Sequence, residues 1–167
     1  LFIGLSVGVN VLVARFIASN REKDTYETVH TAILLAILFG ILFAVIGVTG
    51  ARRILIAMGS PEDVIHLATT YLQIYFCSMP FVALYNFGAA ILRAIGDTRR
   101  PLLYLTIAGI INVLLNLLFV IVFKMDVAGV ALATLTAELV SSILIIICLT
   151  KSKDVIHLNI HELKLHK

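Results

Sequence analysis

Four polar side chains in two neighbouring apolar stretches carry the groups best suited to chemistry in this chain. Asn112 and Asn116 lie four residues apart, and Thr134 and Glu138 repeat that spacing in the next stretch. Residues four apart share one face of a helix, so each pair forms a polar stripe. Amide, hydroxyl and carboxylate oxygens are ligands for cations, and a carboxylate can also take up a proton. We expect the two stripes to face each other across a water-filled or protein-lined interior.

The carboxyl group of Glu138 is the most demanding feature of these stripes. An ionised carboxylate at the centre of a bilayer costs about 2.5–3.5 kcal/mol, so it is expected to titrate or to bind a cation. The alternative is a neutral, buried acid that makes a single hydrogen bond. The amides and hydroxyls would then only join helices, at about 0.6 kcal/mol per bond. The residues themselves leave both alternatives open.

Long apolar stretches must position these side chains. Hydrophobic residues make up 60% of the 167 residues. A helix of roughly 20 residues crosses the apolar core of a bilayer. We predict an all-α, polytopic transmembrane bundle of about five spans, which lie at residues 1–18, 29–50, 62–95, 101–123 and 127–150. The lipid bilayer is therefore an expected partner. Because Leu1 already lies in a span, and five is an odd number for a carrier, we interpret the chain as a fragment.

The basic residues alternate between the ends of these spans. Ten of the 13 Lys and Arg residues lie at or just after the ends of the first, third and fifth spans. The other three lie after the second and fourth spans. Lys and Arg are enriched in cytoplasmic loops, so we expect loops 19–28 and 96–100 and the charged tail 151–167 to be cytoplasmic, in a plasma (inner) membrane. This placement, rather than the net charge of +3, excludes nucleic acid as the expected partner.

Within the spans, three positions predict structure. Pro80 lies in the middle of the third span and should kink it, because proline lacks the N–H that continues the helical ladder. Tyr85 and Asn86 continue a polar face beyond the kink. The Asn10 side chain, in the first span, needs a hydrogen-bond partner within the protein, because lipid offers none. The second span is almost featureless, so we expect much of it to face lipid.

Enzyme signatures are missing from the sequence. It has no Walker loop, no GxGxxG and no recognisable Ser/His/Asp set. His157 and His161 lie four residues apart, but a metal site needs three or four ligands. We expect no catalytic residue, no bound metal and no cofactor.

Several strings of the sequence resemble those of one transporter family. They are Pro80-Phe81, Tyr85-Asn86, the turn from Leu92 to Pro101 (LRAIGDTRRP), NVLLN at 112–116 and VAGVALAT at 127–134. This set resembles the multidrug and toxic compound extrusion (MATE) family. The turn supplies the most specific positions, which are Arg93, Gly96, Asp97, Thr98 and Pro101.

The resemblance implies an architecture of twelve spans in two six-helix lobes. Residues 1–150 would be the second to sixth spans of the N-terminal lobe, and 151–167 the start of the cytoplasmic interlobe linker. The first span and the C-terminal lobe would be the partners of this segment. The implied activity is export of organic cations or other amphipathic small molecules in exchange for H⁺ or Na⁺, by rocking of the lobes. The only cofactor would be the coupling ion.

The resemblance also implies a cation site. Some family members use an Asn and an Asp four residues apart on the fifth span, a Thr on the sixth and an Asp on the first. Asn112 matches the Asn and Thr134 the Thr, whereas Asn116 stands where the Asp would be. The first-span Asp would precede Leu1. Our hypothesis is that Glu138, one turn from Thr134, supplies the lost charge.

Two other functions fit parts of the sequence. A lipid-linked saccharide flippase of the same superfamily would share the lobes, but such proteins usually have a more cationic central cavity, and no span centre here holds Lys or Arg. A non-transporting membrane scaffold or a truncated remnant would fail to confer drug tolerance.

Overall fold

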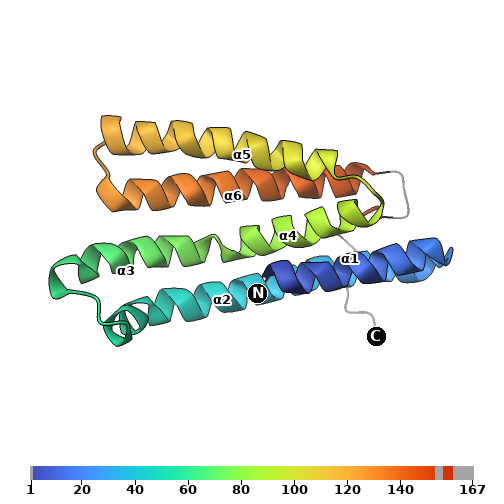
Figure 1. Cartoon of the computed structure of the whole chain (residues 1–167), viewed down its shortest axis with the longest axis horizontal. Helices are drawn as coiled ribbons and strands as arrows, with labels where there is room; N and C mark the ends of the chain where they lie inside the picture. The colour runs from blue at the N-terminus through green and yellow to red at the C-terminus, as the bar shows by residue number, and fades with distance from the viewer. Residues whose placement is uncertain (1, 153–155, 160–167) are drawn as a thin grey trace.

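The computed structural model describes residues 2–152 and 156–159, and every regular element within them is helical (Figure 1). The elements in chain order are α1 Phe2–Ala18, α2 Glu22–Ala57, α3 Glu62–Cys77, α4 Met79–Ala94, α5 Arg99–Leu117, the π-helical turn η1 Leu118–Val122, and α6 Asp126–Lys151.

The helices run along one common direction, with the broken helix α3–α4 in the middle (Figure 1). On one side α2 packs along both α3 and α4, and α1 covers α4. On the other side α6 packs along α3 and α4, and α5 lies outside α6 as the outermost helix. The hairpin of α5 and α6 is therefore attached to the rest of the bundle mainly through α6.

Most of these helices are long and apolar enough to cross a bilayer. Within the described residues α2, α5 with η1, and α6 meet that requirement singly, and α3 with α4 meets it as a pair bent by 40°. The remaining predicted span, α1, is a shorter apolar helix of 17 residues. The chain is an all-α integral membrane protein, as its composition predicts.

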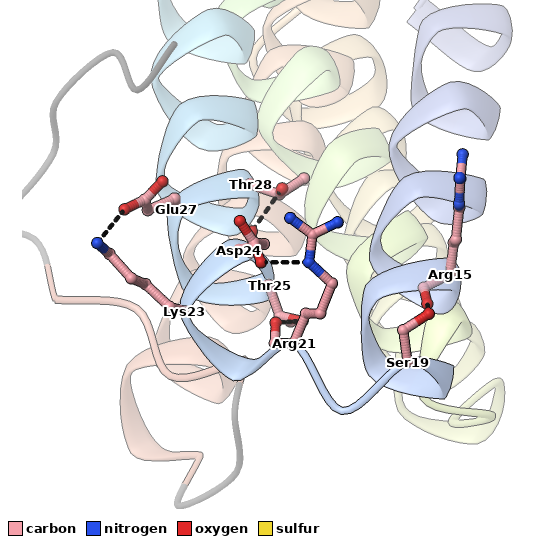
Figure 2. Close-up of polar contacts among 8 residues, drawn as sticks. All are labelled: Arg15, Ser19, Arg21, Lys23, Asp24, Thr25, Glu27 and Thr28. Carbon is pink, nitrogen blue, oxygen red and sulfur yellow. Dashed lines mark hydrogen bonds and ion pairs between the residues drawn. The ribbon is translucent and has the colours of Figure 1, made fainter.

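The predicted loop 19–28 is mostly helical, because α2 begins at Glu22. Figure 2 shows why a charged segment folds this way. Arg21 Nε lies 2.7 Å from Asp24 Oδ2, and the hydroxyl of Thr28 donates to the Asp24 carbonyl at 2.7 Å. The acidic residues of this first turn also lie at the positive end of the helix dipole. Only residues 19–21 connect α1 to α2, with Asn20 at φ 52°.

Other predicted boundaries shift by the same logic. Helix α2 continues beyond the predicted second span to Ala57 through Arg52 and Arg53, which are good helix formers. The loop 96–100 is shorter than predicted, since Arg99 already belongs to α5. The tail predicted to begin at 151 also loses Lys151, the last residue of α6. Most of the predicted tail lies outside the described residues, at 153–155 and 160–167.

The π-helical turn η1 is a feature that the predicted span 101–123 does not contain. The α-helix ends at Leu117, and the Phe123 N–H then donates to the Leu118 carbonyl at 3.1 Å, five residues back. Gly129 lets α6 begin close to this turn, because a Cβ there would lie 3.0 Å from the Phe119 Cβ.

One face of helix α2 packs closely against protein, whereas its other face carries exposed apolar side chains. A Cβ on Gly40 would collide with the backbone of Pro80, and one on Gly47 would collide with the Phe76 ring. The bend between α3 and α4 lies at Ser78, two residues before Pro80. The two glycines of α2 contact the residues on either side of this bend. The expectation that much of the second span faces lipid stays a prediction: Leu38, Ile41, Leu42, Val45 and Ile46 are exposed, and the glycines mark only the packed face.

The side-chain amide of Asn10 finds its hydrogen-bond partner on another helix of the bundle. The Asn10 side chain on α1 donates from Nδ2 to the Ala90 carbonyl on α4 at 2.9 Å. This bond satisfies an amide that lipid could not satisfy, and it fixes α1 along the centre of the bundle.

Candidate cation site between helices α5 and α6

The polar stripes of α5 and α6 meet through a chain of hydrogen bonds. Asn112 donates from Nδ2 to the Thr134 hydroxyl oxygen at 3.3 Å, which joins the two helices. Asn116 donates from Nδ2 to Asn112 Oδ1 at 2.9 Å, and the Thr134 hydroxyl donates to the Val130 carbonyl at 3.1 Å. The three polar side chains are therefore oriented by one another and by the backbone of α6.

This chain of bonds ends on an acceptor that has no donor. Asn116 Oδ1 is buried and makes no hydrogen bond within the described residues. A buried carbonyl oxygen without a partner costs about 1–3 kcal/mol. The free lone pairs of Asn116 can accept a hydrogen bond from a protonated ligand or coordinate a cation.

A hollow of about 220 Å³ lies beside the Asn112–Thr134 bond. Its polar lining comes from Asn112, Thr134 and Glu138, and its remaining wall from Leu105, Ala108, Gly109 and Ala137. Gly109 keeps the hollow open, since no atom lies within 4 Å of a Cβ built there. Sequence reasoning missed Ala108 and Gly109, although two adjacent small residues one turn before Asn112 are a readable signal of space.

Glu138 supplies the carboxylate of this hollow. Its side chain is half-buried, and the described residues offer it no Lys, Arg or His within ion-pair distance. Its backbone carbonyl accepts a bond from the Ser141 hydroxyl at 2.9 Å. A carboxylate, a hydroxyl and an amide oxygen around one small hollow are the donor set of a hard cation.

The structure brings together only part of the predicted pathway. Asn112, Thr134 and Glu138 share the hollow and Asn116 lies one turn away, whereas Tyr85 and Asn86 are not part of its lining. The Tyr85 hydroxyl donates to the Pro101 carbonyl at 2.8 Å, which ties α4 to the start of α5. Asn86 donates from Nδ2 to the Val82 carbonyl of its own helix at 2.8 Å.

The turn between α4 and α5 explains several of the sequence motif's positions structurally. Gly96 has φ 81°, a conformation that favours glycine, and the Asp97 N–H donates to the Leu92 carbonyl at 3.0 Å to close α4. Asp97 Oδ1 then accepts the Arg100 N–H at 3.1 Å, and its Oδ2 lies 3.1 Å from Arg100 Nε. The turn therefore fixes the start of α5, whereas Arg93 is exposed on the last turn of α4 and Thr98 is the exposed residue that precedes α5.

The described residues hold no group of three or more His, Cys, Asp or Glu side chains that could bind a metal ion. His157 is described, and its Nδ1 lies 2.9 Å from the Ser152 carbonyl oxygen. His161, its possible partner in the sequence, lies outside the described residues.

A bundle of apolar helices with an internal polar hollow defines an integral membrane protein of the transporter type. The family model MatE matches residues 1–118, and the chain belongs to this family of MATE multidrug efflux transporters.

Curated relatives and solved structures agree with this membership. The chain is 32% identical over 155 residues to the probable multidrug resistance protein YoeA of Bacillus subtilis (strain 168), covering 90% of this chain and 34% of that protein. It is 43% identical over 79 residues to the probable multidrug resistance protein YpnP of the same organism, covering 47% of this chain and 18% of that protein. The chain therefore spans about a third or less of these relatives.

The fold is similar to that of an outward-facing multidrug resistance MATE family transporter of the MOP superfamily. The TM-score is 0.91 at 23% sequence identity, and the match covers 100% of this chain and 37% of that one.

Proposed function

We propose that this chain is part of a secondary antiporter that exports organic cations or other amphipathic small molecules in exchange for H⁺ or Na⁺. In this proposal two lobes rock to alternate access, and the described helices belong to the N-terminal lobe. The hollow between α5 and α6 is the site of the coupling ion. Asn112, Thr134 and Glu138 bind that ion, and Asn116 orients Asn112.

The observation that carries the proposal is the hollow on which Asn112, Thr134 and Glu138 converge, next to a hydrogen-bond chain that ends on an unpartnered acceptor. Purely structural amides would be expected to satisfy each other, because an unsatisfied buried oxygen destabilises the fold. Here Asn116 Oδ1 has no donor and Glu138 has no basic partner in the described part of the chain. A bound cation, or a proton on Glu138, would match the carboxylate in the hollow, whose lining does not include Asn116.

The size of the hollow supports an ion rather than a drug as its occupant. Pockets for small organic molecules measure about 300–1,000 Å³, and this one measures about 220 Å³. A hydrated or partly dehydrated cation fits, whereas an amphipathic drug needs additional walls. We therefore assign substrate binding to a larger space between lobes, where Tyr85 and Asn86 remain candidates for the pathway.

The ends of the bundle support an orientation for the transporter. The α1–α2 turn, the α4–α5 turn and the end of α6 lie at one end of the bundle (Figure 1). The described basic residues at that end are Arg15, Arg21, Lys23, Arg93, Arg99, Arg100 and Lys151. Positive residues favour the cytoplasmic side, so we propose that this end is cytoplasmic in a plasma (inner) membrane.

The test replaces the carboxylate without changing its size. Full-length transporter carrying Glu138→Gln is expressed in cells that lack other efflux pumps, and ethidium efflux is measured while Na⁺ and pH are varied separately. We expect the ion-dependent part of efflux to fall at least tenfold, because the neutral amide neither binds the cation as strongly nor takes up a proton.

The matched control is Glu62→Gln, the same change at an exposed position in the first turn of α3, which should leave efflux unchanged. Full ion-dependent efflux by the Glu138→Gln variant would remove Glu138 from coupling. Whichever ion loses its effect in that variant identifies the coupling ion.

A further inference from the structure

One buried histidine joins α2 to the segment that follows α6. His30 has 0% of its surface exposed, and its Nε2 accepts the backbone N–H of Asn159 at 3.0 Å, across 129 residues of sequence. Its Nδ1 lies 2.8 Å from the Tyr26 carbonyl oxygen, one turn back on α2. Both ring nitrogens are therefore used, each by a main-chain group.

These two partners define the protonation state of the ring. A backbone N–H can only donate, so Nε2 must carry a lone pair, and a carbonyl oxygen can only accept, so Nδ1 must carry the hydrogen. His30 is thus neutral when the segment is bound. A proton on Nε2 would point an N–H at the N–H of Asn159 and abolish that bond.

The segment that His30 holds is docked, not merely adjacent. Ile156 and Leu158 are 0% and 2% exposed and join the same apolar cluster as Val29, Ile33 and Leu149. The Leu158 N–H also donates to the Leu149 carbonyl on α6 at 3.2 Å. The described contacts of the docked segment, residues 156–159, therefore include main-chain hydrogen bonds to His30 and Leu149 and the buried side chains of Ile156 and Leu158.

We propose that His30 is a proton-sensitive latch for this docked segment. With a neutral ring, the segment is held against α2 and α6. With a protonated ring, the Asn159 bond is lost and residues 156–159 detach from the end of the bundle. Histidine is the side chain that ordinarily changes charge between pH 5 and 8, so a comparison across that range tests the latch.

Other ionisable groups at this end of the bundle must be separated from His30. On α2 they are Tyr26, whose ring lies 4.0 Å from the His30 ring, and Glu22, Lys23, Asp24 and Glu27. On the remaining elements at this end they are Arg15, Arg21, Arg93, Asp97, Arg99, Arg100, Tyr104, Cys148, Lys151 and His157. Free tyrosine, cysteine, lysine and arginine side chains titrate above pH 7.5 and free carboxyls below pH 5, so the variants below are chosen to test the histidines.

His157 is the histidine that lies within the docked segment itself. Its Nδ1 contact with the Ser152 carbonyl oxygen at 2.9 Å requires a hydrogen on that nitrogen, and protonation of the ring leaves this hydrogen in place. The His30 contact through Nε2 is the opposite case. A pH-dependent release therefore points to His30, and the two histidines can be told apart by substitution.

The latch does not depend on the proposed transport activity, and it can be measured without a substrate. Hydrogen exchange of the Leu158 and Asn159 amides is followed by mass spectrometry in the full-length protein in lipid nanodiscs. Each rate is divided by that of the same sequence in an unstructured peptide at the same pH, which removes the intrinsic pH dependence of exchange. We expect protection at pH 7.5 to fall at least tenfold at pH 5.

Three variants separate the possible causes. His30→Leu removes the acceptor, so protection of Asn159 should be low at both pH values. His30→Gln keeps a neutral acceptor on a side chain of similar reach, so protection should not change with pH, whatever its level. His157→Gln should behave as the original protein does. The midpoint of thermal unfolding of each variant shows whether the bundle itself remains folded.

The outcomes are decisive in either direction. Equal protection at both pH values in the original protein, or strong protection in a folded His30→Leu variant, would overturn the latch. So would a pH-dependent loss that persists in His30→Gln or disappears in His157→Gln. If His30→Leu unfolds, the His30→Gln and His157→Gln pair decides alone.

Discussion

The two sides of the bundle are held together by different physical means. On the α2 side, Gly40 and Gly47 bring the backbone of α2 into direct contact with Pro80 and the Phe76 ring. On the α5 side, only 6% of the most apolar 18-residue stretch of α5 with η1 is buried, against 39% of the corresponding stretch of α6. These two helices are joined by the Asn112–Thr134 bond. Steric fit fixes the first side, whereas polar groups and an open hollow mark the second. The difference separates residues that hold the fold from residues available for transport.

The largest expected effect is the loss of a close approach on the tightly packed side. Gly40→Ala adds a Cβ that collides with the Pro80 backbone, which cannot move as the end of a side chain can. We expect a loss of about 1–3 kcal/mol or more, the usual cost of overpacking. The midpoint of thermal unfolding in detergent, followed by size-exclusion chromatography, measures it.

The matched change on the open side is Gly109→Ala on α5. No atom lies within 4 Å of a Cβ at this position. Alanine also has the higher helix propensity, so stability should stay equal or rise slightly. An equal loss of stability in both variants would contradict the contrast between the two sides.

An intermediate effect is expected on transport rather than on folding. Thr134→Val keeps the shape of the side chain but removes the hydroxyl that accepts from Asn112 Nδ2. The loss of one hydrogen bond and one oxygen ligand is about 1–1.5 kcal/mol, or roughly tenfold in ion-dependent efflux. Efflux of ethidium at varied Na⁺ and pH measures the change.

Thr136→Val on the same helix sharpens this result. The Thr136 hydroxyl donates at 2.8 Å to the Leu132 carbonyl of its own helix and is not part of the hollow's lining. Efflux by this variant should match the original protein. Equal defects in the two threonine variants would indicate a general sensitivity of α6 instead of a site at Thr134.

The smallest effect should come from the bond between α1 and α4. Asn10→Leu removes the donor to the Ala90 carbonyl, and interhelical bonds of this kind contribute about 0.6 kcal/mol on average. A small decrease in the unfolding midpoint is expected, with efflux unchanged. Val11→Leu, on the exposed face of the same helix, serves as the control and should show no decrease.

Local rules predicted the features that depend on one residue and its neighbours. Pro80 predicts a broken helix because the missing N–H is a property of proline itself. The pairing of Asn112 with Thr134 follows from a short connection that makes α5 and α6 adjacent and antiparallel. The start of α2 was misjudged because charged residues were interpreted as a loop, although acids in a first helical turn are favourable.

Features that depend on contacts between distant parts of the chain could not be predicted from the local sequence. Gly40 and Gly47 looked featureless because their partners, Pro80 and Phe76, lie on another helix. The acceptor role of His30 could not be predicted, because its donor is a main-chain N–H that lies 129 residues away. Tyr85 shares a face with polar residues in the sequence, yet its hydroxyl is committed to the Pro101 carbonyl.

The π-helical turn at the end of α5 makes the α5–α6 hairpin sensitive to the insertion or deletion of a residue. Asn112 and Thr134 meet because the residues between them, including η1 and the 123–125 connection, have one particular length. One residue more or fewer within the helical part would rotate Asn112 by about 100° around the axis of α5. A chain-length change that a surface loop would absorb would therefore turn the amide away from α6 and leave Thr134 facing Ile111 or Val113.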